Sequence, residues 1–357
     1  MRGDANVGAV VLGGDYQGLG IVRSLGRRSI PVCVLDDEYS IASLSRHATR
    51  SLRVETLGDS EETAAVLLRA GRQLGLDGWV LYPTRDETVA AISRHRAALK
   101  EMFRVPTPEW STVRWASDKR ATYQLAARLE IPTPRTWYVD ELAQLDAIEG
   151  DGPFVIKPAI KGDFFQTTKA KAWKARDRAE LVRRFEEGAR LVGQGELMVQ
   201  ELIPGDGRQQ FAYCAFYKDG ASVGSMAVQR RRQHPPEFGR ASTFVKSIDL
   251  PALTEPSERF LREIDYYGLI ELEYKLDLRD GRYKLLDVNP RTWGYHSLGG
   301  DAGVDFPLLL FRDQLGQPVD VCRARPGRRW IRLLTDLPTG LLEIRTVTCS
   351  GATTYGH

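Results

Sequence analysis

The chain has 357 residues, of which 42% are hydrophobic and 27% charged, a composition typical of a globular protein with two or three domains. Fifty basic and 47 acidic residues leave a formal charge of +3, which gives no support for a nucleic acid or an anionic membrane as the main partner. Four scattered cysteines favour reduced thiols, and no apolar run approaches transmembrane length. We therefore expect a cytoplasmic protein.

The first hundred residues alternate between apolar runs and helical patterns, which predicts a parallel βαβ domain. A polar stretch with no predicted element follows the second run, and the proline-containing sequence RVPTPEW marks a boundary near residue 108. The predicted strands are AVVLGG (9–14), IPVCVLDD (30–37) and DGWVLYPT (77–84), and the predicted helices cover residues 21–28, 61–74 and 84–99.

The rest of the chain mixes helices with alternating strands. One or two helices are predicted over 111–130, followed by strands at 136–140, 153–159 and 196–205 and a helix at 176–191. Two hairpins are predicted, with turns at Asp219-Gly220 and Asp280-Gly281. These patterns predict a second region of α+β type, and we expect domains over 1–108, 109–200 and 201–345 with a tail at 346–357.

The last hairpin carries the most specific chemistry. Glu271 and Glu273 alternate on one face of its first strand, and Asp287 and Asn289 alternate on one face of the second. Because the turn lies midway between Glu273 and Asp287, these two residues can pair across the hairpin. Carboxylate and amide oxygens converging from neighbouring strands suit Mg²⁺, so this face is a candidate metal site. The alternative interpretation is a solvated outer face with cross-strand ion pairs.

This hairpin, ending in DVNPR, resembles the metal-binding strands of the ATP-grasp superfamily. Lys119 after Asp118, Lys157 in VIKP and the segment QELIPG precede it in the order that the resemblance requires. The likeness covers roughly residues 110–325 and is greatest to the carboxylate–amine ligase branch, related to carbamoyl-phosphate synthase and D-aspartate ligase. It implies an ATP-grasp fold, α/β and α+β, preceded by a Rossmann-like N-terminal domain.

The resemblance also assigns roles to individual residues. Glu273, Asp287 and Asn289 match the metal ligands, and Arg291 matches the arginine near the transferred phosphate and the acyl intermediate. Lys157 is expected to take part in catalysis as well as in phosphate binding. The residues expected to bind ATP are Lys119, Lys157 and Lys169, the hinge residues Glu201, Leu202 and Ile203, and Asp206 or Gln209 at the ribose.

Two basic segments each allow two interpretations, a phosphate or substrate contact and a solvated surface. Many ATP-grasp proteins close a glycine-rich loop over the phosphates, but here AIKGDFFQTTKAKAW offers lysines, including Lys169, and a single glycine. This loop either holds phosphate through charge or is a solvated loop. From the run at 230–232, Arg231 is the candidate for a substrate contact, against the alternative of a solvated run. His234 and His296 have no metal-binding spacing and are expected to be structural.

The glycine-containing stretch VVLGGDYQGLG resembles the start of a dinucleotide-binding domain. Asp15 stands where the fingerprint G-x-G-x-x-G requires its second glycine, so NAD binding is disfavoured. We expect this loop and YPTRDE to bind the acceptor substrate, because both follow strands whose carboxyl ends form ligand sites in open α/β sheets. Tight turns and helix caps are the alternative. The candidate residues are Gly13, Gly14, Gln17, Arg85, Asp86 and Glu87.

The function that the resemblance implies is an ATP-dependent carboxylate–amine ligase that forms an acyl phosphate and releases ADP and phosphate. The cofactors would be ATP and two Mg²⁺ ions, for which Mn²⁺ can substitute. The substrates would be a small carboxylic acid and an amine, with amino acids favoured, and a homodimer is compatible with the sequence. An ATP-grasp carboxylase, a kinase and a non-catalytic nucleotide-binding protein remain open.

Overall fold

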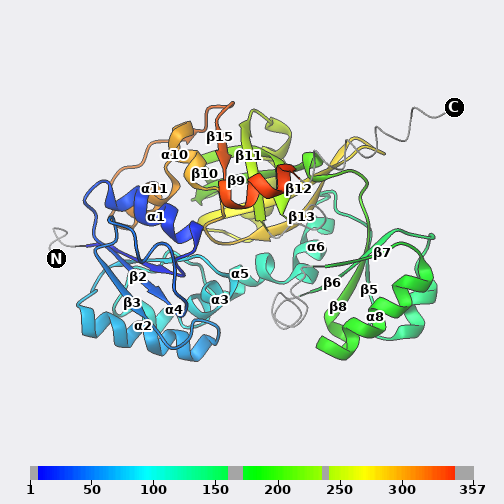
Figure 1. Cartoon of the computed structure of the whole chain (residues 1–357), viewed down its shortest axis with the longest axis horizontal. Helices are drawn as coiled ribbons and strands as arrows, with labels where there is room; N and C mark the ends of the chain where they lie inside the picture. The colour runs from blue at the N-terminus through cyan, green and yellow to red at the C-terminus, as the bar shows by residue number, and fades with distance from the viewer. Residues whose placement is uncertain (1–6, 160–171, 235–240, 342–357) are drawn as a thin grey trace.

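The computed structural model describes residues 7–159, 172–234 and 241–341, and its strands form three sheets. The molecule is elongated. The N-terminal sheet lies at one end and a small sheet at the other, and the largest sheet lies between them on the upper side in Figure 1. This mixed arrangement agrees with the predicted combination of α/β and α+β parts. The predicted domain boundaries near residues 108, 200 and 345 stay a prediction.

The N-terminal sheet is parallel, with the strand order β3-β2-β1-β4, which confirms the predicted βαβ organisation. The edge strand β3 lies in the polar stretch for which the sequence predicts no element. The strands are β1 (Ala9–Leu12), β2 (Val32–Asp36), β3 (Arg50–Arg53) and β4 (Val80–Pro83). The helices are α1 (Tyr16–Gly26), α2 (Ser60–Leu74), α3 (Asp86–Arg94) and α4 (Arg96–Lys100).

Side chains of β1 are buried on both faces, as is usual in a parallel sheet. Val10 packs in a core with α2, whereas Val11 joins a second core that continues into the C-terminal part of the chain. That second core includes Cys214, Trp293 and Phe306. The N-terminal sheet is therefore joined to the rest of the molecule by continuous apolar packing.

Two helices, α5 (Trp110–Ser117) and α6 (Lys119–Arg128), run from the N-terminal part toward the small sheet (Figure 1). The small sheet is antiparallel with the order β5-β8-β6-β7, and α8 (Arg178–Val192) packs against it. Its strands are β5 (Thr136–Tyr138), β6 (Phe154–Pro158), β7 (Trp173–Ala175) and β8 (Leu197–Glu201). Short 3-10 turns cover Leu142–Ala147 and Gln194–Glu196.

The largest sheet has the order β13-β12-β9-β10-β11-β15, with β14 paired to β10. Both predicted hairpins are confirmed, since β9 pairs with β10 and β12 with β13, and Gly220 and Gly281 have the positive φ that such turns favour. The strands are β9 (Gln210–Lys218), β10 (Ala221–His234), β11 (Ala241–Ile248), β12 (Gly268–Asp277), β13 (Arg282–Asn289), β14 (Cys322–Arg323) and β15 (Arg329–Ile331).

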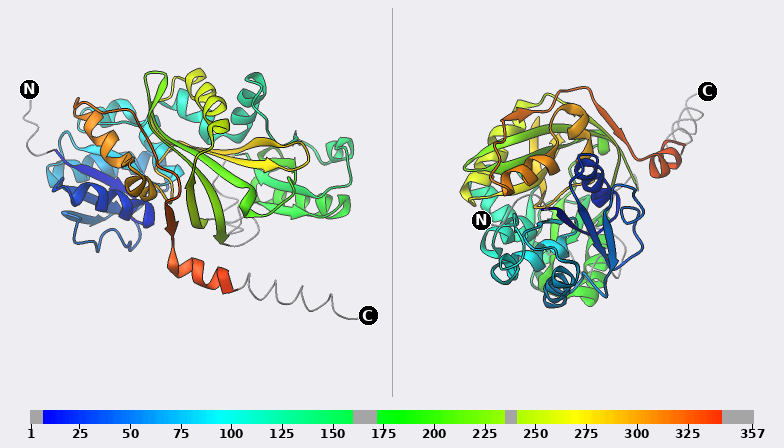
Figure 2. Two further views of the ribbon diagram at one scale, coloured as in Figure 1. Left: turned by 90° about the horizontal axis from the view of Figure 1, so that it is seen from above. Right: turned by 90° about the vertical axis from the view of Figure 1, so that its left-hand side faces the viewer.

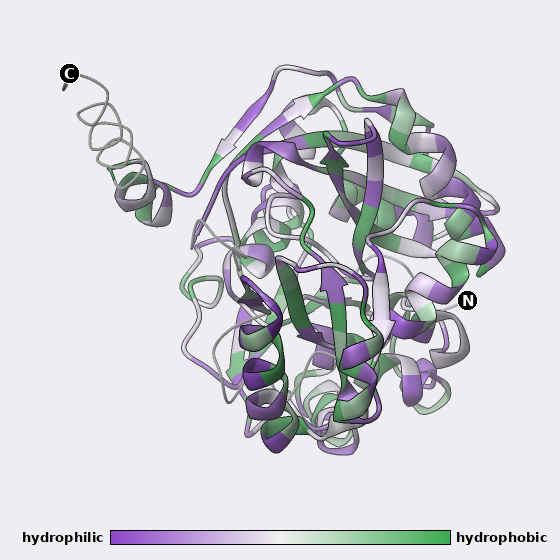
Figure 3. Ribbon diagram, turned by 90° about the vertical axis from the view of Figure 1, so that its right-hand side faces the viewer, coloured by the Kyte–Doolittle hydropathy of each residue, from purple (hydrophilic) through white to green (hydrophobic). Residues whose placement is uncertain are grey.

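The faces of this sheet are covered by helices and by the N-terminal part. The turns Gly207–Gln209 and Pro251–Leu253 and the helices α9 (Thr254–Glu263), α10 (Ser297–Ala302) and α11 (Phe306–Gln314) complete the region. Residues 333–341 form a last described helix that projects from the body (Figure 2). Hydrophilic and hydrophobic residues alternate along the surface helices in Figure 3, as expected of helices that pack on one side.

Every helix in residues 7–159, 172–234 and 241–341 is too short or too polar to cross a membrane.

Candidate functional site

The predicted pairing of acidic residues across the last hairpin is confirmed. Glu273 lies opposite Asp287, and Glu271 lies opposite Asn289. The side-chain amide of Asn289 donates from Nδ2 to Oε1 of Glu273 at 3.1 Å and to Oε2 of Glu271 at 3.0 Å. The three predicted metal ligands therefore lie together, and the amide orientation is fixed by two carboxylates.

Glu271 lies buried behind the three predicted metal ligands. It is only 4% exposed and accepts a hydrogen bond from the Tyr295 hydroxyl. Burial, reinforced by the nearby charge of Glu273, raises the pKa of Glu271 to about 7. Glu271 consequently acts as the inner support that orients Asn289, while Glu273 and Asp287 are the more accessible carboxylates.

Each accessible carboxylate has a cation beside it. Lys119 Nζ lies 2.8 Å from Asp287 Oδ1, and Arg230 Nη2 lies 3.1 Å from Glu273 Oε2. The face is therefore a compact charged cluster rather than an open solvated surface. Of the basic run, it is Arg230 that touches the cluster, whereas Arg231 is exposed and bonds to Gln229. Arg232 instead pairs with Asp336 of the last described helix.

The donor set fits a hard cation. Two carboxylates and an amide oxygen on adjacent strands supply the oxygen ligands that Mg²⁺ prefers. Across the described residues, no group of three His, Cys, Asp or Glu side chains is placed to hold a metal by itself. A cation at Glu273, Asp287 and Asn289 would thus need further oxygen ligands from water or from a bound molecule.

The two predicted phosphate-binding lysines converge on the same hairpin. Lys157, on β6, donates to the Tyr123 hydroxyl at 2.7 Å, and that hydroxyl donates to the carbonyl of Leu286 at 2.6 Å. Lys119 begins α6, and both lysines are less than 10% exposed. Tyr123 thus links the small sheet to the hairpin. Lys169 lies outside the described residues.

The predicted adenine hinge begins at Glu201, the last residue of β8, and leads to β9. Ile203 is buried, and its carbonyl accepts a hydrogen bond from Lys275 Nζ at 2.8 Å. Asp206 and Gln209, the candidates for ribose contact, form a reciprocal capping box around the turn Gly207–Gln209. The ribose contact stays a prediction, and the structure gives both side chains a local structural role.

Arg291 joins the hairpin to the N-terminal domain. Its Nε lies 2.7 Å from Asp86 Oδ1, and its Nη2 lies 3.5 Å from Asn289 Oδ1. Two candidate substrate residues that are 205 positions apart in sequence are therefore brought together. Glu87, the next residue after Asp86, is exposed in the first turn of α3.

The glycine loop after β1 is held by an ionic network. Gly14 N–H donates to Asp36 Oδ2 at 2.6 Å, and Arg85 contacts both Asp36 and Asp37. In a dinucleotide-binding domain, the acid at the end of the second strand contacts the ribose. Here the Asp36 carboxylate accepts from Gly14 and Arg85, and the expectation that the loop does not serve NAD stays a prediction.

Gly13 in this loop has a conformational role, and Gly20 in α1 has a packing role. Gly13 has φ of +88°, a conformation that favours glycine. A Cβ on Gly20 would lie 2.4 Å from His296 Nε2, and that ring atom contacts the carbonyl of Gln17 at 3.0 Å. Burial lowers the pKa of His296 to about 4, consistent with the expected structural role of this neutral ring.

Sequence reasoning missed the roles of Tyr123 and Tyr295 and placed Glu271 on the acidic face without assigning it a role. The roles of Tyr123 and Tyr295 depend on contacts over more than twenty residues and have no local motif. Glu271 had a signal, because it alternates with Glu273 on the same strand face.

Comparisons with known proteins identify the fold. No protein-family model matches the chain. The D-aspartate ligase of Enterococcus faecium (strain Aus0004) is 23% identical over 301 residues, which cover 79% of this chain and 70% of that protein. An L-amino acid ligase structure from Bacillus licheniformis is similar with a TM-score of 0.67 and 16% identity, over 87% of this chain and 74% of that one.

The biotin carboxylase domain of Hydrogenobacter thermophilus 2-oxoglutarate carboxylase, solved with MgADP, ADP and bicarbonate, is also similar. Its TM-score is 0.69 at 16% identity, over 90% of this chain and 73% of that one. This chain therefore has the ATP-grasp fold preceded by a Rossmann-like domain, as its motifs indicated.

Proposed function

We propose that this protein is an ATP-dependent ligase that joins a carboxylic acid to an amine through an acyl phosphate. The observation that carries the proposal is the convergence of Glu273, Asp287 and Asn289 with Lys119 and Arg291 at one end of the β12–β13 hairpin. The similarity to D-aspartate ligase and to L-amino acid ligase supports amino acids as the substrate class.

ATP and Mg²⁺ are the proposed cofactors. The relative solved with MgADP supports this choice, and the acid pair is suited to two ions, with Mn²⁺ as a substitute. Bound Mg²⁺ would offset the negative charge of the phosphates and of the acid that approaches them. Lys119 would then exchange Asp287 for a phosphate oxygen, and Lys157 would hold a second one from the small sheet.

The chemistry consists of two steps. A carboxylate oxygen of the acid attacks the γ-phosphorus of ATP, ADP leaves, and an acyl phosphate forms. The amine nitrogen then attacks the acyl carbon and loses a proton, and phosphate leaves with the electron pair of the C–O bond. Arg291 can stabilise the oxyanion that forms in this second step, because its guanidinium lies next to Asn289.

The acceptor is proposed to bind between the hairpin and the N-terminal loops. The Arg291–Asp86 pair lies at this junction, and Arg85 and Gly14 lie in the adjoining network. Asp86 carries the charge that an ammonium group requires, and it would exchange its bond to Arg291 for the amine. Arg291 would then be released toward the acyl phosphate.

The test is release of ADP and phosphate over a matrix of amino acids offered as acids and amines, with mass detection of products. The proposal predicts turnover only when an acid and an amine are both present, and an amide of their combined mass less water. Phosphorylation of an alcohol would establish a kinase instead. Carboxylation that depends on bicarbonate would establish a carboxylase.

A further inference from the structure

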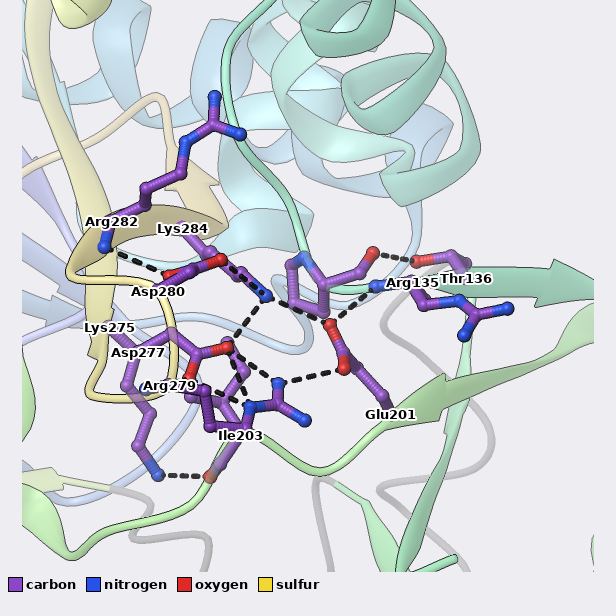
Figure 4. Close-up of polar contacts among 11 residues, drawn as sticks. Arg135, Thr136, Glu201, Ile203, Lys275, Asp277, Arg279, Asp280, Arg282 and Lys284 are labelled. Carbon is purple, nitrogen blue, oxygen red and sulfur yellow. Dashed lines mark hydrogen bonds and ion pairs between the residues drawn. The ribbon is translucent and has the colours of Figure 1, made fainter. Parts of the chain in front are cut away.

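The end of β8, where the adenine hinge begins, has an irregular hydrogen-bond ladder. Glu201 N–H donates to the Arg135 carbonyl at 3.0 Å, which makes the two residues a hydrogen-bonded pair. In a regular antiparallel pair, the Arg135 N–H would return to the Glu201 carbonyl. It donates instead to Oε1 of the Glu201 side chain at 3.0 Å (Figure 4). The Glu201 side chain thus accepts the Arg135 N–H, which in a regular ladder would bond to the Glu201 carbonyl.

The Glu201 carboxylate is held in this position by two cations from the hairpin. Lys284 Nζ lies 3.1 Å from Oε1, and Arg279 Nη2 lies 2.8 Å from Oε2. Asp277, which is fully buried, pairs with both cations (Figure 4). Burial opposes ionisation, yet the Arg135 N–H and the two cations keep the pKa of Glu201 below its usual value.

The following hinge residues are fixed to the same hairpin. Lys275 Nζ donates to the carbonyls of Ile203 and Gly205, each at 2.8 Å. Lys275 lies two positions after Glu273 on β12, so one strand carries both a proposed metal ligand and the support of the hinge. The hinge and the proposed metal ligand Glu273 are therefore both attached to β12.

From this geometry, and resting on the proposed function, we propose that Glu201 is a positioning residue for base selection. By accepting the Arg135 N–H, its side chain keeps the Glu201 carbonyl available for an exocyclic amino group of the base. Adenine presents such a donor at its 6-position, whereas guanine presents an oxygen there. The carbonyl therefore favours ADP and repels the corresponding edge of GDP.

The test compares ADP and GDP binding by the full chain, with Mg²⁺, in two variants of Glu201. Glu201→Ala lets the Arg135 N–H return to the backbone carbonyl, so ADP affinity should fall about tenfold, as for the loss of one hydrogen bond, while GDP affinity changes little. Glu201→Gln keeps a side-chain oxygen for the Arg135 N–H, so it should retain the preference for ADP even if the lost ion pairs lower the melting temperature.

Glu149→Ala is the matched control, because Glu149 pairs with the guanidinium of Arg135 rather than with its backbone N–H and is largely exposed. It should leave the ratio of ADP to GDP affinity unchanged. In steady state, Glu201→Ala should raise KM for ATP with kcat nearly unchanged, a split that a general loss of stability does not produce.

The outcomes separate this inference from the proposed function. A wild-type protein that prefers ADP, with a Glu201→Ala variant that keeps that preference, would overturn the role of Glu201 alone. An equal loss of preference in Glu201→Gln would also overturn it, because glutamine keeps the acceptor. A wild-type protein that binds neither nucleotide would refute the proposed function itself.

Discussion

Neutralising Asp287 tests the proposed metal ligands most sharply. Asp287→Asn keeps the size of the side chain but removes the charge that lies 2.8 Å from Lys119 Nζ. At that separation and an effective dielectric constant of about 20, the Coulomb attraction is about 6 kcal/mol. Desolvation of the two groups, whose side chains are only 17% and 9% exposed, offsets most of it. We expect a net loss of about 1–3 kcal/mol in the free energy of unfolding.

The effect of Asp287→Asn on turnover should be larger. If this carboxylate holds the cation that neutralises phosphate charge, its loss removes several kcal/mol of transition-state stabilisation, roughly a thousandfold in rate. Phosphate release measures the rate, and urea unfolding measures stability. Glu263→Gln, which removes an exposed charge from the end of α9, is the control and should change neither. Turnover within twofold of wild type in Asp287→Asn would refute the metal assignment.

Three further predictions concern binding and stability. ADP with Mg²⁺ should stabilise the fold, by about 2.7 kcal/mol at a hundredfold excess over Kd, and NAD should not, as thermal melting can show. Gly20→Ala should cost about 1–3 kcal/mol through overlap with His296, whereas Gly300→Ala, whose added Cβ meets no atom, should cost nothing in the same urea titration. The partners of Asp277, chiefly Arg279, lower its pKa. Its stabilisation should therefore be present above about pH 4 and lost as the pH falls below that value, so the stability difference between wild type and Asp277→Asn should shrink there.

Much of the proposed site was predictable because its residues obey local periodicity. The Asp280-Gly281 turn lies close to midway between Glu273 and Asp287, but the register at the turn alone would place Glu273 opposite Leu286, and an irregularity between Glu273 and Tyr274 brings Asp287 into that position. Lys157 could be singled out because a lysine within the apolar strand FVIKP requires a polar partner. The parallel N-terminal sheet followed from apolar runs that are buried on both faces.

The features that were missed depend on tertiary contacts. The strand β3 escaped prediction because it is a sheet edge whose residues are mostly polar and exposed. The choice among the three arginines at 230–232 depends on the irregular pairing of β10 with β11 at these residues and on the tertiary contact of Arg230 with Glu273, which lies two strands away. The interaction of Glu201 with Arg135 spans 66 positions and has no periodic signal. Sequence motifs thus located the hinge, but not the contacts of Glu201 with Arg135, Lys284 and Arg279 that hold it in place.

The most direct test of the proposed ligase chemistry follows one oxygen atom. An acid that supports turnover is labelled with ¹⁸O in its carboxylate, and the released phosphate is analysed by mass spectrometry. Because the acid oxygen attacks phosphorus and leaves with it, the account predicts one ¹⁸O in each phosphate and an unlabelled ADP. Phosphate that contains no ¹⁸O, while amide accumulates at the normal rate, would contradict the acyl-phosphate mechanism.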